Sequence, residues 1–287
     1  MTNCFFVTDL HGNTGRFQKL FQAILKEKPE AVFWGGDFLP LISYAPRSMN
    51  FSHRDFVYEY LAKELGGIRD KLKNTYPRIF LIMGNDDPRF QEAAVLDVAS
   101  QGIWEYIHDR KCEFKGFPVY GYAYVPPTPF RVKDWERYDV SRYVDPGCIS
   151  PEEGIRSFPV PDQEKRYATI QNDLARLTGD DNLDRAIFLF HAPPYQTPLD
   201  LAALKGKMID AVPLDPNVGS IAIRRFIEKR QPLLTLHGHI HESPRLSSSW
   251  REVLGRTHCF SAAHDGPELA LIRFDPDHLE AATRELI

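Results

Sequence analysis

Three histidines occur within five positions of the chain, at His237, His239 and His241. Buried neutral histidines need partners, and a metal ion is the commonest partner for several imidazoles that lie together. The apolar residues 232–236 before them indicate a buried strand, whose end would deliver the imidazoles into a site. One core histidine beside two exposed ones explains this stretch equally well. The choice between a metal site and an ordinary strand end therefore depends on the rest of the chain.

Other residues that can bind metals follow further strand-like segments. Apolar runs at residues 4–7, 31–34, 79–83 and 186–190 predict buried strands. They are followed, in chain order, by Asp9, His11, Asp37, Asn85, Asp86 and His191. A lone histidine after a strand is more often structural, but Pro193 and Pro194 rigidify the turn that would hold His191 in one direction.

Helical spacing of apolar residues follows each of the first three strands. Helices are expected over residues 14–26, 56–72, about 88–99, 163–177 and 219–228, with a loop over 40–52 and a polar final helix after Pro276. Shorter strands are expected over residues 103–107, 112–114, 117–122, 257–261 and 268–274. This alternation implies parallel strands with right-handed crossovers, and ligands in such sheets lie beyond the carboxyl ends of the strands. The metal-binding residue types therefore converge on one edge, as scattered surface residues would not.

The segment from residue 124 to residue 162 is the least regular part of the chain, with seven prolines among tyrosines and charged residues. A loop of this length inside a compact domain is usually functional or disordered. We expect a lid over the site, and the alternative is a plain surface insertion. Because both halves of the chain supply site residues and no linker is visible, residues 1–287 are expected to form one domain.

Composition restricts the class of protein. The chain has 287 residues, of which 43% are hydrophobic and 26% charged, as in globular proteins. The formal charge of −4 argues against a nucleic-acid partner, although a local basic patch would still allow one. The four cysteines show no metal-knuckle or disulfide spacing. No signal peptide and no run of about 18 apolar residues is found, so we expect a cytoplasmic protein without a membrane partner.

Five short motifs occur in a fixed order at the ends of the expected strands. They are Asp-x-His at 9–11, Gly-Asp at 36–37, Gly-Asn-x-Asp at 84–87, His-x-Pro-Pro at 191–194 and Gly-His-x-His at 238–241. In this order they resemble the calcineurin-like metallophosphoesterases, over most of the chain. The resemblance implies an α/β protein with a four-layer α-β-β-α sandwich, in which two mixed β-sheets are flanked by helices around a two-metal site.

The resemblance also implies a set of metal ligands. Asp9, His11 and His241 would hold one metal, Asn85, His191 and His239 the second, and Asp37 would bridge the two. His237 falls outside the Gly-His-x-His register and is expected to be a buried support. Strand alternation would send all three histidines to one side, so periodicity does not make this choice. Mixed imidazole, carboxylate and amide ligands suit two divalent or trivalent transition metals, namely Mn²⁺, Fe²⁺/Fe³⁺ or Zn²⁺, rather than Mg²⁺ or Ca²⁺.

The implied reaction is hydrolysis of a phosphoester, with a diester or a small phosphorylated metabolite favoured over a phosphoprotein. The enzyme would be a phosphodiesterase, or else a phosphomonoesterase. Two carboxylates cannot neutralise two divalent ions, so the site would attract an anionic phosphate. A hydroxide bridging the metals would attack phosphorus in line with the leaving group. The alternatives are a metal-dependent nuclease and a metal-bearing binding or scaffold protein with little turnover. The sequence predicts no particular oligomeric state.

The candidate catalytic residues, Asp86 and Asp87, include one departure from the family. Many members carry a histidine after Gly-Asn, proposed to protonate the leaving oxygen, where this chain has Asp86. Beside two cations its pKa should be lowered, and an ionised carboxylate is no acid at pH 7. The leaving group would then be good already, or protonated by His264 or a tyrosine of residues 124–162. Asp87 is expected to support the ligands, with helix N-capping as the alternative.

Overall fold

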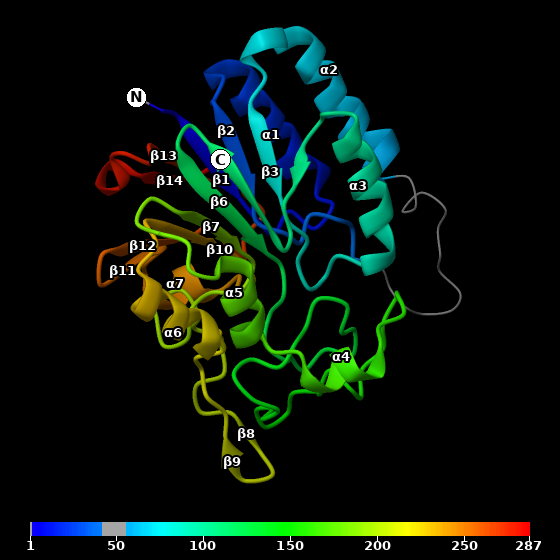
Figure 1. The fold of residues 1–287 in the computed structure, drawn as a ribbon, viewed down its shortest axis with the longest axis vertical. Helices are drawn as coiled ribbons and strands as arrows, with labels where there is room; N and C mark the ends of the chain where they lie inside the picture. Colours follow the sequence, from blue (N-terminus) through cyan, green and yellow to red (C-terminus); the bar gives the residue numbers. More distant parts are fainter. Residues whose placement is uncertain (1, 42–55) are drawn as a thin grey trace.

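The N-terminal strands form the first of two six-stranded β-sheets (Figure 1). The computed structural model describes residues 2–41 and 56–287. The sheet has the order β14-β13-β1-β2-β3-β4 and comprises β1 (Cys4–Val7), β2 (Ala31–Trp34), β3 (Arg78–Leu81), β4 (Glu105–Tyr106), β13 (Ala270–Phe274) and β14 (Thr283–Leu286). Strands β1 to β4 run parallel, whereas β13 and β14 pair antiparallel, so the sheet is mixed.

The second sheet has the order β11-β12-β10-β7-β6-β5. It comprises β5 (Arg110–Phe114), β6 (Phe117–Tyr122), β7 (Ile187–Phe190), β10 (Leu234–His237), β11 (Arg251–Leu254) and β12 (Thr257–Ser261). Its four central strands run parallel and its two edge strands antiparallel. A separate hairpin of β8 (Met208–Ile209) and β9 (Val212–Pro213) projects from the body of the molecule (Figure 1).

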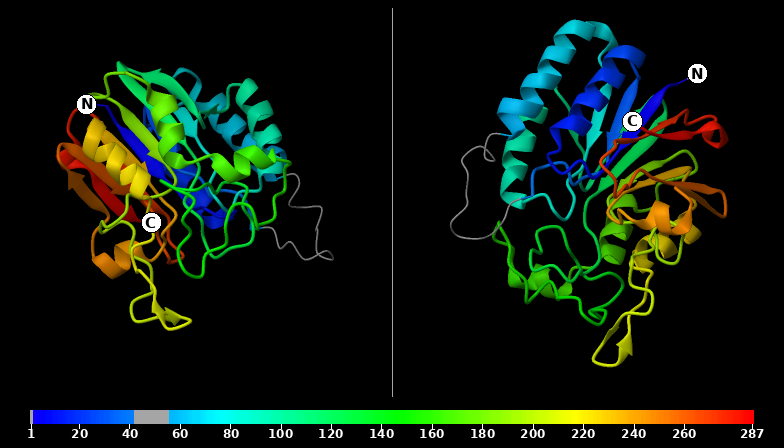
Figure 2. Two further views of the ribbon diagram at one scale, coloured as in Figure 1. Left: turned by 60° about the horizontal axis from the view of Figure 1, so that its bottom comes forward. Right: turned by 180° about the vertical axis from the view of Figure 1, so that it is seen from behind.

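Helices cover the outer faces of both sheets (Figures 1 and 2). The first sheet carries α1 (Thr14–Glu27), a π-helical segment (Phe56–Ala62) that continues into α2 (Lys63–Leu72), and α3 (Glu92–Ser100). The second carries α5 (Ile170–Thr178), α6 (Ile221–Arg230) and α7 (Ser243–Ser247), while α4 (Asp162–Tyr167) lies below the sheets in Figure 1. Short 3₁₀ turns occur at Lys73–Thr75, Arg89–Gln91 and Leu279–Ala281. In the described ranges no helix is long and apolar enough to span a bilayer.

Aromatic contacts join the four layers. Phe17 of α1 packs against Trp34 of β2, with ring centroids 5.4 Å apart. The rings of Phe80 and Phe114, 5.9 Å apart, connect the two sheets across their inner faces. Strands β1, β2, β7 and β10 are buried at every residue, as expected for parallel strands covered on both sides. The expected α-β-β-α sandwich of two mixed sheets is confirmed.

Two expected helices are wrong in detail. The single helix over residues 163–177 is divided into α4 and α5, because Thr169 is extended and its hydroxyl caps α5 by accepting from the Asn172 amide. The polar helix after Pro276 is instead a 3₁₀ turn followed by β14, which pairs with β13. A helix there would leave the outer edge of β13 without backbone partners. Most of the expected 40–52 loop lies outside the described residues.

Residues 124–162 precede α4 and form a packed excursion (Figure 2). Trp135, Lys133 and Glu136 are almost fully buried, and the Lys133 ammonium pairs with the Glu136 carboxylate. The Trp135 indole N–H donates to the backbone oxygen of Asp87 at 2.8 Å. The segment is therefore anchored to the loop that follows β3, and its role as a lid stays a prediction.

Candidate metal centre

The loops after β1, β2, β3, β7 and β10 meet at one edge of the two sheets, as the strand pattern predicts. They bring together Asp9, His11, Asp37, Asn85, His191, His239 and His241. Metal-binding side chains separated by up to 232 positions in the sequence thus lie side by side. Asp37 belongs to both of the groups into which they fall.

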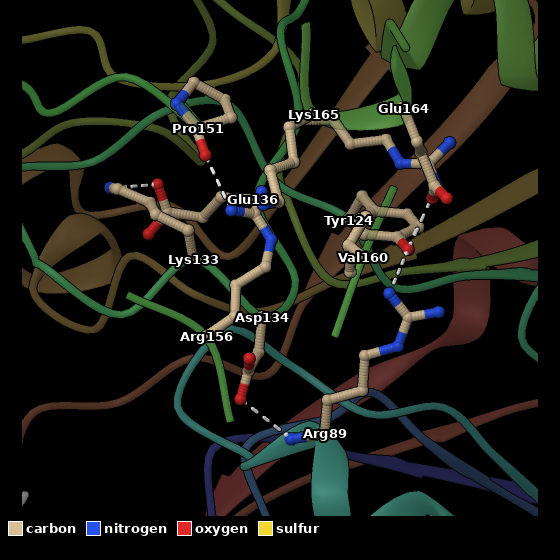
Figure 3. Close-up of a pocket in the computed structure, with 11 residues that line it drawn as sticks. Arg89, Tyr124, Lys133, Asp134, Glu136, Pro151, Arg156, Val160, Glu164 and Lys165 are labelled. Atoms are coloured by element: carbon tan, nitrogen blue, oxygen red, sulfur yellow. Dashed lines mark hydrogen bonds and ion pairs between the residues drawn. The ribbon is translucent and has the colours of Figure 1, made fainter. Parts of the chain in front are cut away.

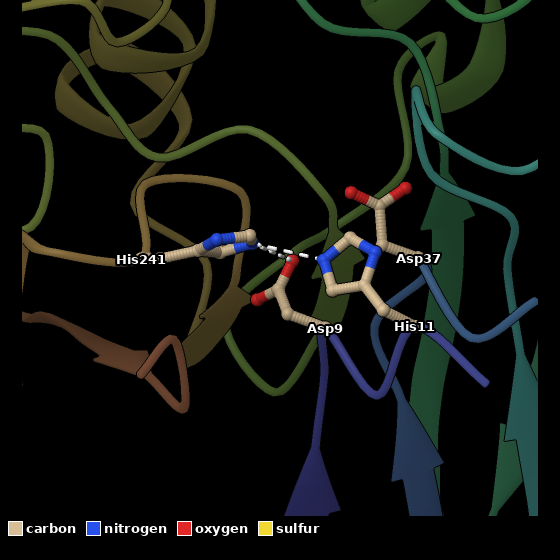
Figure 4. A group of neighbouring side chains, drawn as sticks. All are labelled: Asp9, His11, Asp37 and His241. Carbon is tan, nitrogen blue, oxygen red and sulfur yellow. Dashed lines mark hydrogen bonds and ion pairs between the residues drawn. The ribbon is translucent and has the colours of Figure 1, made fainter. Parts of the chain in front are cut away.

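The first group contains Asp9, His11, Asp37 and His241, whose possible ligand atoms all lie within 4.8 Å of one another (Figure 4). The Nε2 atoms of His11 and His241 are 3.0 Å apart, and the His241 Nε2 is 3.4 Å from a carboxylate oxygen of Asp9. The Nδ1 of His11 is buried and has no hydrogen-bond partner among the described residues. Nitrogen and oxygen donors therefore face one small volume from three loops.

The second group contains Asp37, His191 and His239, again with ligand atoms within 4.8 Å. Asn85 extends this group, because its side-chain oxygen is 3.1 Å from the His191 Nε2. The same Nε2 is 3.1 Å from a carboxylate oxygen of Asp37. The His191 Nδ1 lies 2.7 Å from the backbone oxygen of Gly35 and can donate to it. That bond fixes the ring so that Nε2 points into the site.

Backbone strain is concentrated at these residues. Asp9, His11, Asp37 and His239 have φ values of 56°, 45°, 49° and 72°, in the left-handed region. Non-glycine residues adopt this region rarely, and such conformations cluster at functional sites where the surroundings enforce them. The strained turns aim the side chains at one another rather than along the strands.

Two glycines of the motifs have a spatial role that the sequence reasoning did not assign. A Cβ at Gly84 would collide with the Asp37 carboxylate, and a Cβ at Gly238 would collide with the side chains of Thr8 and Asp9. The sequence could have indicated this role, because each glycine stands directly before an expected metal ligand, Asn85 or His239. Arg16 is a further residue of the site that the sequence did not indicate. Its guanidinium donates to the Asp9 backbone oxygen at 2.6 Å.

Asp87 is buried and connects two of the site loops. Its carboxylate accepts hydrogen bonds from the amides of Phe38 and Leu39 after β2, at 3.0 and 2.8 Å, and from the Gly84 amide after β3, at 2.9 Å. The following 3₁₀ turn has Pro88 at its N-cap and no side-chain cap. Asp87 therefore orders the loops that carry Asp37 and Asn85, and the N-capping alternative is wrong.

His237 makes hydrogen bonds within the protein with both ring nitrogens. Nδ1 lies 2.9 Å from the Ala192 backbone oxygen and Nε2 lies 2.7 Å from the Thr235 hydroxyl. The ring stacks on Phe190 with an interplanar angle of 8°. Strand β10 ends at His237, so His239 and His241 lie in a loop, and the premise that strand alternation would place all three on one side is wrong. The burial of His237 agrees with a supporting role.

The electrostatics of the site centre on two carboxylate–imidazole pairs. Burial opposes protonation of His191, but the charge and hydrogen bond of Asp37 raise its pKa to about 10. Burial also opposes protonation of His241, whose hydrogen bond with Asp9 raises its pKa to about 9. Burial and the positive charge of His191 lower the pKa of His239 to about 3. Protons on His191 and His241 thus balance the buried carboxylates when no cation is bound.

Asp86 faces the first group from its edge. Its carboxylate is 3.8 Å from the His11 Nδ1, its side chain is 32% exposed, and its amide donates to Asp37 at 2.8 Å. Burial and the charge of Asp37 raise the pKa of Asp86 to about 7 in the absence of cations. The lowered pKa expected from the sequence requires bound metal ions and stays a prediction.

Comparison with known proteins identifies the family. The sequence profile described as calcineurin-like phosphoesterase matches residues 3–243. No curated protein matches the sequence. Among solved structures, TT1561 of Thermus thermophilus has a TM-score of 0.56 and 15% identity, with 99% of this chain and 98% of that chain covered.

A second solved structure, described as a dimetal phosphatase from Danio rerio, has a TM-score of 0.50 and 12% identity. The match covers 94% of this chain and 91% of that chain. At these identities the two structures share the fold with this protein, and the profile match over most of the chain carries the family assignment. The chain belongs to the calcineurin-like phosphoesterase family.

Proposed function

We propose that the seven clustered residues hold two transition-metal ions. Asp9, His11 and His241 would bind the first, Asn85, His191 and His239 the second, and Asp37 both. The observation that carries this proposal is the position of Asp37 in both ligand groups. The unpartnered His11 Nδ1 and the facing His11 and His241 nitrogens fit cation binding. The donor set suits Mn²⁺, Fe²⁺/Fe³⁺ or Zn²⁺.

The reaction that this site supports best is hydrolysis of a phosphodiester. Two such metals, when bound, lower the pKa of a water molecule and stabilise negative charge on the phosphoryl oxygens. The carboxylate of Asp86 stands at the edge of the first group, 3.8 Å from His11. When ionised it would repel the second negative charge of a phosphomonoester more than the single charge of a diester. This charge discrimination supports a phosphodiesterase.

Residues 1–287 would act as one domain, because ligands come from the loops of both sheets. Within it, residues 124–162 would cover the site. The hydrogen bond between the Trp135 indole and the backbone of Asp87 supports this placement, since Asp87 orders the loop that carries Asn85 and Asp86.

Replacing Asp87 with Asn tests how the ligands are positioned. An amide cannot accept at both ends, so a backbone N–H of Gly84, or those of Phe38 and Leu39, would face an NH₂ group. We expect metal affinity to fall by about 10- to 100-fold, measured by competition with a chromogenic chelator. Unfolding free energy should fall by about 1–3 kcal/mol.

Asp139→Asn is the matched control for this variant. The Asp139 carboxylate accepts from the amides of Ile221 and Ala222 and caps the start of α6, away from the ligand loops. It should lose similar stability and keep wild-type metal affinity. Equal loss of metal by the two variants would show that Asp87 acts only through overall stability.

Metal uptake should depend on pH through the two paired histidines. His191 and His241, with pKa values raised to about 10 and about 9, are protonated at neutral pH, whereas ligation needs neutral rings. Binding at pH 7.5 should therefore release at least about two protons, with more if a bound water ionises, and affinity should rise between pH 6 and pH 9. Calorimetry in buffers of different ionisation enthalpy counts the protons. Release of no protons would contradict these pairings.

A metal-titrated substrate screen tests the proposed reaction. Turnover of aryl phosphodiesters should appear as two equivalents of Mn²⁺, Fe²⁺ or Zn²⁺ are bound, and it should exceed that of aryl phosphomonoesters. Cyclic nucleotides, which are also diesters, form the third arm of the screen. Asp37→Ala, which removes the shared ligand, should reduce turnover to background. A metal-loaded protein inert on every aryl phosphoester would instead indicate a binding or scaffold role. Cleavage of single-stranded DNA with Mn²⁺ would indicate a nuclease.

Replacing Asp86 with His tests protonation of the leaving oxygen. An imidazole at this position can donate a proton, whereas a carboxylate beside two cations cannot, so turnover of diesters with poor leaving groups should rise by about tenfold or more. The measurement is the dependence of kcat on the leaving-group pKa. Asp86→Asn removes the negative charge but adds no group that can transfer a proton. The dependence of kcat on the leaving-group pKa should therefore stay steep. An unchanged slope in Asp86→His would show that this position is not near the leaving oxygen.

A further inference from the structure

A pocket of ≈ 370 Å³ lies between residues 154–160 and α4, and it shares Arg156 and Lys165 with the narrower recess drawn in Figure 3. This volume is within the usual range of small-molecule sites. Arg156 and Lys165 bring two cationic side chains to its wall, and Phe158 contributes a ring that is 51% exposed. Arg156 and Lys165 also line a narrow inner recess of ≈ 10 Å³ that extends to Arg89. The pocket is separate from the clustered metal-binding side chains.

The deeper cations of this region already have anionic partners. The buried Lys133 ammonium pairs with Glu136. The Arg137 guanidinium pairs with Asp173 at 2.6 Å and also with Glu164. These groups satisfy one another and need no ligand. A ligand in the pocket would therefore have to bind the other two cationic side chains of the wall, Arg156 and Lys165.

Arg156 has no such partner. Its guanidinium donates to the Pro151 backbone oxygen at 2.6 Å, and among residues 2–41 and 56–287 no carboxylate lies within the 4.0 Å of an ion pair. The nearby Asp134 instead accepts from the Arg89 amide and from the amide and hydroxyl of Ser157. Burial, only partly offset by the charge of Asp134, lowers the pKa of Arg156. A partly desolvated guanidinium is thus left with unused donors facing a cavity.

Lys165 adds a second available charge. Its ammonium pairs with Asp162 at 2.9 Å, but the Asp162 side chain is 93% exposed. Exposed ion pairs contribute little, so a ligand can replace this one at small cost. Arg156 and Lys165 together can therefore hold an oxyanion, with the Phe158 ring beside it for an apolar part of the ligand.

The pocket is joined to the loop that carries the candidate metal ligands. Arg89 follows Asn85 by four residues, so their Cα atoms are at most about 14 Å apart. The Arg89 amide donates to the Asp134 carboxylate at 2.9 Å. Trp135, which follows Asp134, donates its indole N–H to the Asp87 backbone oxygen. Arg89 lines the narrow recess together with Arg156 and Lys165, so the loop that carries Asn85 continues directly to the cationic wall of the pocket.

We propose that the pocket lined by Arg156 and Lys165 binds a second anionic group of the substrate, a phosphate or a carboxylate remote from the phosphoester that is cleaved. The proposal rests on the phosphodiesterase function proposed above. The pocket would make the enzyme prefer substrates that carry two anionic groups over substrates that carry one. Phosphate and carboxylate share the bidentate recognition by arginine, and the experiment distinguishes them.

The kinetic test compares three aryl phosphodiesters that differ at one remote position, which carries a carboxylate, its methyl ester or a phosphate. The metal-loaded wild type should prefer an anionic substrate over the ester by at least about tenfold in kcat/KM, mainly through KM. Whether carboxylate or phosphate gives the larger ratio identifies the anion. Arg156→Gln and, separately, Lys165→Gln should bring the ratio close to one.

Arg131→Gln is the matched control, because Arg131 lies in the same segment, is exposed and is absent from the pocket wall. It should keep the wild-type preference, and thermal unfolding of each variant should confirm that it is folded. An Arg156→Gln variant that is folded and retains the preference would overturn the proposal. A wild type that treats the ester and both anions alike would do the same.

Direct binding separates this proposal from the proposed function. Inorganic phosphate, and in a second titration succinate, is added to the chelator-treated full-length protein, so that metals bind neither probe. Binding of either probe that weakens at least about tenfold in Arg156→Gln but not in Arg131→Gln supports the pocket even if no phosphoester is hydrolysed. Equal binding by the two variants, or no binding by the wild type, overturns it even if the enzyme hydrolyses diesters.

Discussion

The buried carboxylate of Asp37 is the constraint on which the site depends. It follows β2 of the first sheet, is only 2% exposed, and contacts His191, which follows β7 of the second sheet. A charge taken out of water costs several kcal/mol unless it is paired and hydrogen-bonded, on the order of the whole stability of a domain. The two sheets must therefore meet so that the His191 imidazole reaches the Asp37 carboxylate, which also accepts from the Asp86 amide of its own sheet. The same closure places the other donors around it.

This closure is maintained against backbone strain. Each left-handed non-glycine residue costs on the order of 1–3 kcal/mol, and four of the seven clustered residues have this conformation. The surrounding structure opposes relaxation, because Asp87 ties the loops after β2 and β3 together and Gly84 leaves room for Asp37. His237 supports the loop after β7 through its hydrogen bond to Ala192. Strands β1, β2, β7 and β10, which lead into the site loops, are buried at every residue, so the core supplies the rigidity that the site uses.

The sequence by itself determined most of the architecture and all seven clustered residues. Apolar runs of strand length, each followed by a helical pattern, predicted the parallel strands β1, β2 and β3, because burial and periodicity are local properties. The second sheet was expected from the order of the five motifs and their resemblance to a known family. The site residues could be found since each directly follows such a run. The pattern became specific because residues with metal-binding chemistry follow five different strands, β1, β2, β3, β7 and β10. For Asp87 the sequence left a supporting role and helix N-capping open, and only its hydrogen bonds to the amides of Phe38, Leu39 and Gly84 decided between them.

The tertiary structure decided what local patterns do not encode. Residues after Pro276 form β14 rather than a helix because the edge of β13 needs backbone partners. His239 and His241 leave the strand that holds His237, since the Gly238 turn brings the chain against Thr8 and Asp9. Arg156 likewise lacks a carboxylate partner because the nearby carboxylates of Asp134 and Glu136 are bonded to Ser157 and Lys133. Each of these outcomes is set by partners distant in sequence, whose positions exist only once the two sheets have packed.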